Sequence, residues 1–173
     1  MKKGLLIINT GNGKGKTTAA LGMAMRAAGH GMRICIIQFI KGDWPYGELT
    51  SIKKLADTIE IHVMGRGCTW LSDDIEKDKA AALDAWDFAQ NILADESYDL
   101  VVLDEFTFLL KYDIVAIQPV LAVLARRPPT QHVVITGRSA PEALVAAADL
   151  VTEMVPIKHP YDIGIKAQQG VEF

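Results

Sequence analysis

The chain has little of what marks secreted, membrane and nucleic-acid-binding proteins. Its 173 residues include only two cysteines, Cys35 and Cys68, whose separation fits neither a C-x-x-C motif nor a metal-ligand spacing. No apolar run reaches the roughly 20 residues of a transmembrane helix, and the N-terminus shows no signal-peptide pattern. A net charge of −3 gives no general attraction to nucleic acid. These absences predict a cytoplasmic protein that binds neither membranes nor nucleic acid.

The sequence also lacks the linkers and repeats that divide a chain into several domains. No linker rich in proline, glycine or serine divides the chain, and no internal repeat is evident. Half of the residues are hydrophobic, so a chain of this length can bury a core as one unit. We therefore expect a single domain over residues 1–173.

Apolar, β-branched runs alternate with helical patterns along the chain. The runs predict strands at residues 4–9, 33–39, 59–63, 100–103, 132–136 and 150–155. Helical spacing of apolar residues predicts helices at 17–28, 72–94, 112–125 and 141–148. Strands that are hydrophobic throughout are typical of a parallel sheet covered on both faces, which predicts a three-layer α/β fold. Cys35 lies in one of these runs, where a small buried hydrophobic residue is expected.

The most informative segment is a glycine-rich turn between the first predicted strand and the first predicted helix. Its residues are Thr10, Gly11, Asn12, Gly13, Lys14, Gly15, Lys16, Thr17 and Thr18. A strand, a glycine-rich turn and a helix with Gly-Lys-Thr at the junction are the context of a phosphate-binding P-loop. Backbone N–H groups and the helix N-terminus would hold phosphate, Lys16 would reach the terminal phosphates, and the Thr17 hydroxyl would contact magnesium. The segment predicts a nucleoside triphosphate site and a P-loop NTPase (RecA-like) fold, with a mainly parallel sheet of about six strands.

One position departs from the usual P-loop pattern. The rule G-x-x-x-x-G-K-[ST], counted back from Gly15, requires glycine where this sequence has Thr10. The dinucleotide pattern G-x-G-x-x-G fails as well, because Lys16 stands at its last glycine. The loop is therefore a P-loop variant.

A second predicted strand, at residues 100–103, ends in two carboxylates, Asp104 and Glu105. In P-loop proteins such a strand delivers an acid to magnesium, which prefers oxygen ligands. The spacing leaves open which carboxylate contacts the ion, because successive side chains of a strand point in opposite directions. Arg138 ends the next strand, where it fits either a phosphate clamp or an ordinary surface arginine.

Further motifs follow the P-loop in a fixed order. They are RAAGHG at residues 26–31, QFIKG at 38–42, WPYGE at 44–48, GCTW at 67–70 and HPYDIGIKAQQGVEF at 159–173. Together they resemble the ATP:corrinoid adenosyltransferases of the CobA/BtuR type, and the resemblance covers essentially the whole chain.

The resemblance implies transfer of the 5′-deoxyadenosyl group of ATP to the Co(I) centre of a reduced corrinoid, with release of triphosphate. The product would be adenosylcobalamin or an adenosylated cobinamide or cobyrinate. In this family the nucleotide lies in the loop in reverse orientation, and the unusual Thr10 is consistent with that. ATP and cob(I)alamin or another corrinoid would be the substrates, with magnesium or manganese as the metal. A flavoprotein reductant and a homodimer are also expected.

Particular residues take roles from the same resemblance. Residues 10–18 and Arg26 would bind ATP, and Lys16 and Thr17 would act in catalysis. Glu105 would be a metal ligand and catalytic residue, Asp104 would support the metal, and Arg138 would be a catalytic residue near the triphosphate.

The corrinoid side of the resemblance is incomplete. Family members commonly carry a phenylalanine and a tryptophan that help to displace the lower axial ligand of the corrinoid; here Trp70 matches and Cys68 replaces the phenylalanine. Cys68 fits either a passive small residue or a cobalt ligand, and Trp70 fits either the corrinoid site or the core. Many members also have an N-terminal extension that covers the site. The run from His159 is expected to form a lid, or else a docked tail.

Two other functions fit parts of this pattern. A conventional P-loop NTPase or kinase accounts for the P-loop and the carboxylate strand, and it would release orthophosphate from ATP. A non-catalytic corrinoid carrier accounts for the incomplete aromatic pair, and it would bind corrinoid without turnover.

Overall fold

The protein is built around one six-stranded sheet. The structure is a computed structural model that describes residues 3–41, 46–65, 67 and 75–172. The strands are β1 (Leu6–Thr10), β2 (Ile34–Gln38), β3 (Ile59–Val63), β4 (Leu100–Asp104), β5 (His132–Thr136) and β6 (Leu150–Glu153). Their order is β3-β2-β4-β5-β1-β6, and all neighbouring pairs are parallel. The predicted six-stranded parallel sheet is confirmed.

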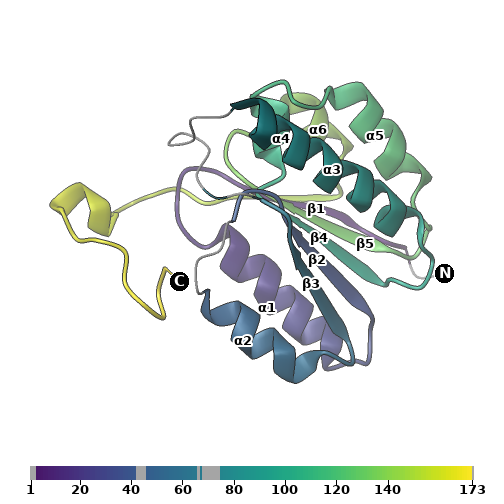
Figure 1. The fold of residues 1–173 in the computed structure, drawn as a ribbon, viewed down its shortest axis with the longest axis horizontal. Helices are drawn as coiled ribbons and strands as arrows, with labels where there is room; N and C mark the ends of the chain where they lie inside the picture. Colours follow the sequence, from purple (N-terminus) through teal and green to yellow (C-terminus); the bar gives the residue numbers. More distant parts are fainter. Residues whose placement is uncertain (1–2, 42–45, 66, 68–74, 173) are drawn as a thin grey trace.

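Helices cover both faces of the sheet, as the sequence predicts (Figure 1). On one face lie α1 (Lys16–Ala28) and α2 (Gly47–Ile52), which continues into the 3-10 turn η1 (Lys53–Leu55). On the other lie α3 (Ile75–Ala94), α4 (Thr107–Lys111), α5 (Ile117–Arg126) and α6 (Glu142–Ala147). This is a three-layer α/β arrangement.

The helices differ from the predicted ones in number and, by more than one residue, at the start of one helix. The short helices α2 and α4 carry no clear periodic pattern and were not predicted. The helix predicted at 112–125 begins only at Ile117, because Asp113 has a φ of 52°, which a right-handed helix does not allow. Residues 72–74 of the helix predicted at 72–94 lie outside the described residues, and the rest is helical.

Consecutive residues of the central strands enter two different cores. In β4, Val101 and Leu103 belong to the core beneath α3, α5 and α6, whereas Leu100 and Val102 belong to the core beneath α1. Because both faces are buried, the strands read as unbroken hydrophobic runs. Cys35 of β2 is fully buried in the first core, and burial raises the pKa of its thiol to about 12. The prediction of a buried Cys35 is confirmed.

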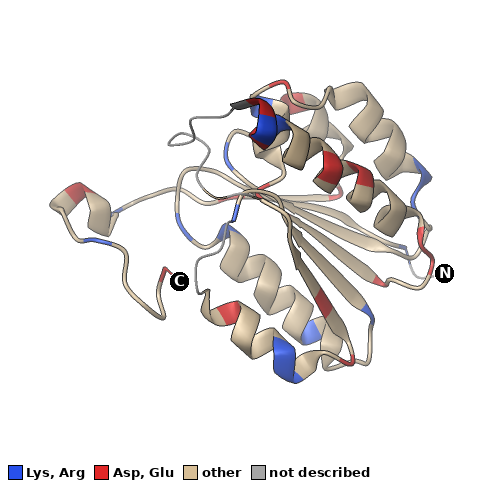
Figure 2. Ribbon diagram, viewed as in Figure 1, with Lys and Arg blue, Asp and Glu red and all other residues tan. Residues whose placement is uncertain are grey.

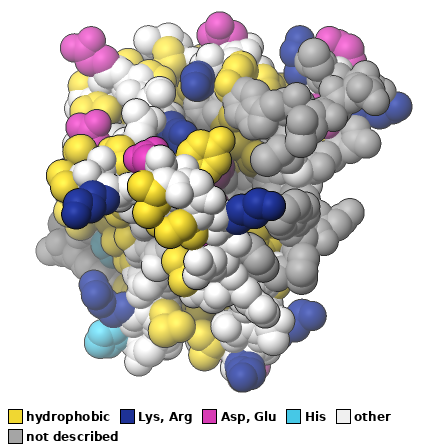
Figure 3. Space-filling view, turned by 90° about the vertical axis from the view of Figure 1, so that its left-hand side faces the viewer, with side chains coloured by type: hydrophobic (Ala, Val, Ile, Leu, Met, Phe, Trp, Pro, Cys, Tyr) yellow, Lys and Arg dark blue, Asp and Glu magenta, His cyan; other side chains and the backbone are white. Residues whose placement is uncertain are grey.

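The chain leaves the sheet through an exposed arm. β6 is an edge strand, and all four of its residues are exposed. The arm continues through η3 (Pro160–Ile163) and returns toward the P-loop side of the molecule (Figure 1). Apolar side chains on it face solvent, including Ile157 at 88% exposure, and hydrophobic and basic groups are interspersed on the face that the arm occupies (Figure 3).

Charged residues lie mainly in the helices and at the ends of elements, with few in the strands (Figure 2). Within the described part of the chain, no helix is long and apolar enough to cross a membrane.

Candidate nucleotide site

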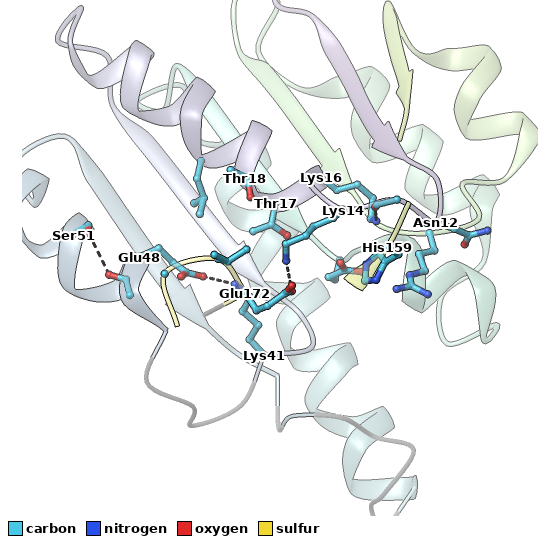
Figure 4. Close-up of a pocket in the computed structure, with 18 residues that line it drawn as sticks. Asn12, Lys14, Lys16, Thr17, Thr18, Lys41, Glu48, Ser51, His159 and Glu172 are labelled. Carbon is cyan, nitrogen blue, oxygen red and sulfur yellow. Dashed lines mark hydrogen bonds and ion pairs between the residues drawn. The ribbon is translucent and has the colours of Figure 1, made fainter. Parts of the chain in front are cut away.

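A cleft of about 580 Å³ opens beside the P-loop (Figure 4). The carboxyl ends of β1, β2, β4 and β5 lead into the loops that line it, where a parallel α/β sheet usually holds its ligand. The P-loop contributes Asn12, Gly13, Lys14, Gly15, Lys16, Thr17 and Thr18. Other parts of the chain contribute Lys41, Glu48, Ser51, Glu105, Arg138, His159 and residues 170–172. The structure therefore brings together most of the residues that the sequence predicted for ATP.

The P-loop backbone is held in place by the end of β6. Gly11 and Gly15 have φ values of 95° and 111°, which favour glycine. The N–H of Gly13 donates to the carbonyl oxygen of Met154 at 2.6 Å, and a Cβ on Gly13 would lie 2.6 Å from that same oxygen. The glycines of the loop thus allow the close approach of Met154, the residue that follows β6.

Lys16 is folded back onto the loop at the start of α1. Its Nζ donates to the carbonyl oxygen of Gly13 at 2.7 Å, and the residue is only 7% exposed. Burial lowers the pKa of Lys16, and the nearby charge of Arg138 lowers it further, whereas Glu105 opposes the shift. The ammonium group stands at the helix N-terminus, where an anion gains from both the charge and the helix dipole.

Asp104 faces inward and is sealed by hydrogen bonds. Its Oδ1 accepts from Oγ1 of Thr17 at 2.8 Å and from Oγ1 of Thr136 at 2.7 Å, while Oδ2 accepts from Nε2 of Gln38 at 3.2 Å. The residue is 1% exposed and does not line the cleft. Its carboxylate therefore fixes the Thr17 hydroxyl from behind.

Glu105 turns the opposite way and lines the cleft. Its φ of 60° is uncommon for a residue other than glycine, and its N–H donates to Oγ1 of Thr136 at 2.8 Å. Burial raises the pKa of Glu105, Asp104 raises it further, and the cations Lys16, Arg138 and Lys41 oppose this in decreasing order. Such a backbone conformation at a binding cleft is a common sign of a functional constraint.

The donor set around these two acids suits a hard cation. The oxygen atoms of this set that line the cleft come from Thr17 and Glu105, and oxygen atoms are the ligands that magnesium prefers. Asp104 is linked to this site through its hydrogen bond from the Thr17 hydroxyl. Across the ranges that the structure describes, no group of three or more His, Cys, Asp and Glu side chains could hold a metal. Phosphate oxygens and water would therefore have to complete the coordination.

The loop after β5 presents Arg138 to the cleft. Gly137 has a φ of 137°, and a Cβ there would lie 2.1 Å from Oγ1 of Thr107. That hydroxyl donates to the carbonyl oxygen of Arg138 at 2.7 Å. Thr107, at the start of α4, thereby fixes the loop, a role that no sequence pattern signalled.

Some predicted site residues lie elsewhere. The Oγ1 of Thr10 accepts from the N–H of Ala140 at 3.2 Å and ties the end of β1 to the loop after β5, so this side chain does not line the cleft. Gly11 packs against Met154 instead. Arg26 is exposed in the last turn of α1, about 15 Å along the helix from Lys16, and the fold does not bring it to the cleft. Cys68 and Trp70 lie outside the described residues.

Two ion pairs in the cleft were not predicted. Lys14 of the P-loop pairs with Glu172 near the end of the arm, and Lys41 after β2 pairs with Glu48 of α2 (Figure 4). The position of Lys41 just after a central strand was an available signal, since the carboxyl ends of β2 and β4 lie side by side. No local pattern links Glu172 to the P-loop.

The sheet order, the P-loop between β1 and α1 and the acid at the end of β4 define an α/β nucleotide-binding protein of the P-loop class. A solved structure of the flagellar accessory protein FlaH from Methanocaldococcus jannaschii has a similar fold. Its TM-score is 0.59 at 12% identity, over 88% of this chain and 72% of FlaH.

The sequence comparisons define the family. The family model described as ATP:corrinoid adenosyltransferase BtuR/CobO/CobP matches residues 2–173. A corrinoid adenosyltransferase of Pseudomonas aeruginosa is 46% identical, over 99% of this chain and 85% of that protein. One from Escherichia coli K12 is 44% identical, over 99% of this chain and 87% of that protein. The chain belongs to the ATP:corrinoid adenosyltransferase family, which confirms the resemblance drawn from its motifs.

Proposed function

We propose that the protein transfers the 5′-deoxyadenosyl group of ATP to the Co(I) centre of a reduced corrinoid and releases triphosphate. The observation that carries this proposal is the family match over residues 2–173, together with a P-loop cleft lined by four basic side chains, Lys14, Lys16, Lys41 and Arg138. The product would be adenosylcobalamin, or the corresponding adenosylated cobinamide or cobyrinate.

In the proposed reaction, Co(I) attacks carbon 5′ of the ribose. The Co–C bond forms, the C5′–O bond breaks, and its electron pair leaves with the triphosphate. No proton is transferred, so no general base is required. Catalysis rests on stabilising a highly charged leaving group, for which Lys16, Arg138 and the P-loop N–H groups other than that of Gly13, which donates to Met154, are suited. The P-loop would thus bind the triphosphate as a leaving group, and ATP would lie in the loop in the orientation opposite to that in kinases.

The proposed metal is magnesium, or manganese, held with the triphosphate by Glu105 and Thr17. A divalent cation at this point neutralises phosphate charge. The hydrogen bond from Thr17 to Asp104 supports Thr17 as a metal ligand and Asp104 as its support. The Thr17 hydroxyl donates its proton to Asp104 and keeps its oxygen lone pairs for the metal, while Asp104 stays buried. Arg26 has no role in the proposal for this chain.

The remaining parts of the proposal concern partners. Cys68 and Trp70 remain the proposed corrinoid contacts, and a flavoprotein is the expected reductant. We also expect a cytoplasmic, single-domain protein over residues 1–173 that forms a homodimer. The exposed edge strand β6 and the apolar side chains of the arm support a partner chain on that side.

The test is adenosylation itself. The protein is incubated with ATP, magnesium and chemically reduced cobalamin, and the visible spectrum is followed for a light-sensitive Co–C product. We expect turnover of added corrinoid. A folded protein that binds corrinoid tightly and forms no such product with cobalamin or cobinamide would be a carrier, and the proposed function would be wrong.

A further inference from the structure

Lys41 is a basic side chain on the wall of the cleft opposite the P-loop. It follows β2, and Figure 4 shows it across the cleft from Thr17 and Thr18. Its side chain is 17% exposed, whereas lysine side chains usually remain in solvent. A lysine so far withdrawn from water, and lining a polar cleft, requires a partner or a ligand.

The ammonium group of Lys41 is fixed from two sides. Its Nζ donates to Oε1 of Glu48, whose side chain is 18% exposed, and it lies 4.3 Å from the centroid of the Tyr46 ring. Burial alone would raise the pKa of Glu48, but the hydrogen bond from Lys41 and a backbone N–H lower it below its ordinary value. The carboxylate is thus held ionised, and Lys41 is oriented before any ligand arrives.

The charges of Lys41 and of the P-loop lysine, Lys16, both act on Glu105. Lys16, Arg138 and Lys41 are the cations whose charges favour ionised Glu105. Lys16 and Arg138 approach from the β1 and β5 sides, and Lys41 approaches from the end of β2. A triphosphate beside Glu105 would therefore lie between cations on opposite walls.

A role in stability alone does not account for the position of the Lys41–Glu48 ion pair in the cleft. The turn of chain that carries Glu48 is already anchored, because Ile52 is buried and Leu55 packs against the core beneath α1. A secluded ion pair adds little net stability, since desolvation offsets much of its attraction. A lysine held ready in a polar cleft is, by contrast, the arrangement that stabilises developing negative charge.

We propose that Lys41 is a further catalytic residue of adenosyl transfer, which contacts the triphosphate and stabilises the charge that reaches it as the C5′–O bond breaks. Glu48 is its positioning residue. The electron pair of the broken bond goes to the leaving oxygen, Co(I) supplies the pair of the new Co–C bond, and Lys41 keeps its proton. This inference rests on the proposed function.

The experiment compares Lys41→Met and Lys41→Arg with wild type in kcat and KM for ATP, at saturating reduced cobalamin. Lys54→Met, on the exposed turn η1, is the matched control. We expect Lys41→Met to lower kcat about 100-fold with a much smaller change in KM. Lys41→Arg should recover part of that loss because it restores the charge, and Lys54→Met should match wild type.

Glu48 gives an independent readout. Glu48→Gln should lower kcat by about tenfold, because Lys41 stays charged but loses its carboxylate partner and keeps only the contact with the Tyr46 ring. Glu48→Asp should recover part of the loss, because it restores a carboxylate. Circular dichroism and thermal unfolding identify variants that fail to fold; should Lys41→Met do so, the Glu48 pair decides.

A folded Lys41→Met with kcat within twofold of wild type would overturn the inference, as would a change confined to KM. Glu48→Gln indistinguishable from wild type would overturn the positioning role. If the wild-type protein itself forms no adenosylated corrinoid, the proposed function is wrong. If the wild type is active and Lys41→Met is equally active, only the role of Lys41 is wrong.

Discussion

The two neighbouring carboxylates at the end of β4, Asp104 and Glu105, lie in opposite environments. Asp104 is closed off by Thr17, Thr136 and Gln38, and it orients a hydroxyl. Glu105, one residue later, takes a left-handed backbone conformation and faces the cleft with a raised pKa caused first by burial. Ionising Glu105 therefore depends on the cations that a nucleotide site supplies.

At the scale of single residues, the Lys16→Ala variant tests the proposed triphosphate site. Loss of the buried ammonium group at the N-terminus of α1 should lower the rate of adenosyl transfer by roughly 100-fold or more and weaken ATP binding. Steady-state kinetics and calorimetric titration with ATP measure both effects. Lys54→Ala serves as the control, and near-normal rates for Lys16→Ala would show that the site has been assigned wrongly.

A second residue-scale prediction concerns Cys35. Its thiol is buried in the core and its pKa is raised to about 12, so it should be inert in the folded state. In a Cys68→Ser variant, where Cys35 is the remaining cysteine, a chromogenic disulfide reagent at pH 8 should report no thiol until denaturant is added. Stoichiometric labelling of the native protein would contradict the assignment.

The strand pattern pointed to the two acids without separating them, and only the family resemblance assigned Glu105 to the metal and Asp104 to its support. A strand pattern specifies alternation, but it reveals neither the positive φ of Glu105 nor the hydrogen bond from its N–H to Thr136 of β5, a residue distant in sequence. For the same reason the roles of Thr10 and Thr107 were invisible, because their partners lie on loops distant in sequence. Lys16 and Thr17 could be placed because a P-loop is a local motif.

At the scale of elements, the P-loop depends on β6. The carbonyl oxygen of Met154 accepts a hydrogen bond from Gly13 and occupies the space that a side chain there would need. The arm adds a second link through the ion pair of Lys14 and Glu172. The end of the chain thus shapes a site whose motif lies near its beginning.

Two glycine substitutions test the first link. Gly13→Ala should destabilise the protein by about 1–3 kcal/mol and reduce ATP binding, because the new methyl group displaces Met154. Gly22→Ala is the control, since a Cβ there meets nothing within 4 Å in the middle of α1, and it should stabilise by about 0.5–1 kcal/mol. Denaturant unfolding measures both, and equal effects at the two sites would refute the proposed contact.

The second link is tested with Glu172→Gln. A triphosphate and the Glu172 carboxylate compete for Lys14, so removal of the carboxylate charge should tighten ATP binding about two- to fivefold. The effect should shrink at high salt, because the pair is partly exposed. Weaker binding in the variant would instead mean that Glu172 helps to hold the nucleotide.

For the whole molecule, the sequence was most informative where burial is complete. The six strands could be predicted within a few residues. For the four central strands the reason is that both faces are covered and the hydrophobic runs are continuous, whereas β6 is exposed. The strand order and the short helices α2 and α4 depend on tertiary packing and could not be predicted. The same applies to the course of the arm, whose apolar side chains remain exposed in the single chain.

The central claim is that the P-loop holds a leaving group. The most direct measurement identifies the phosphate species that the protein produces from ATP while it adenosylates reduced cobalamin, by phosphorus NMR or ion-exchange analysis. We predict inorganic triphosphate in a one-to-one ratio with the Co–C product. Orthophosphate and ADP, formed without a Co–C product, would contradict the claim and indicate ordinary P-loop hydrolysis.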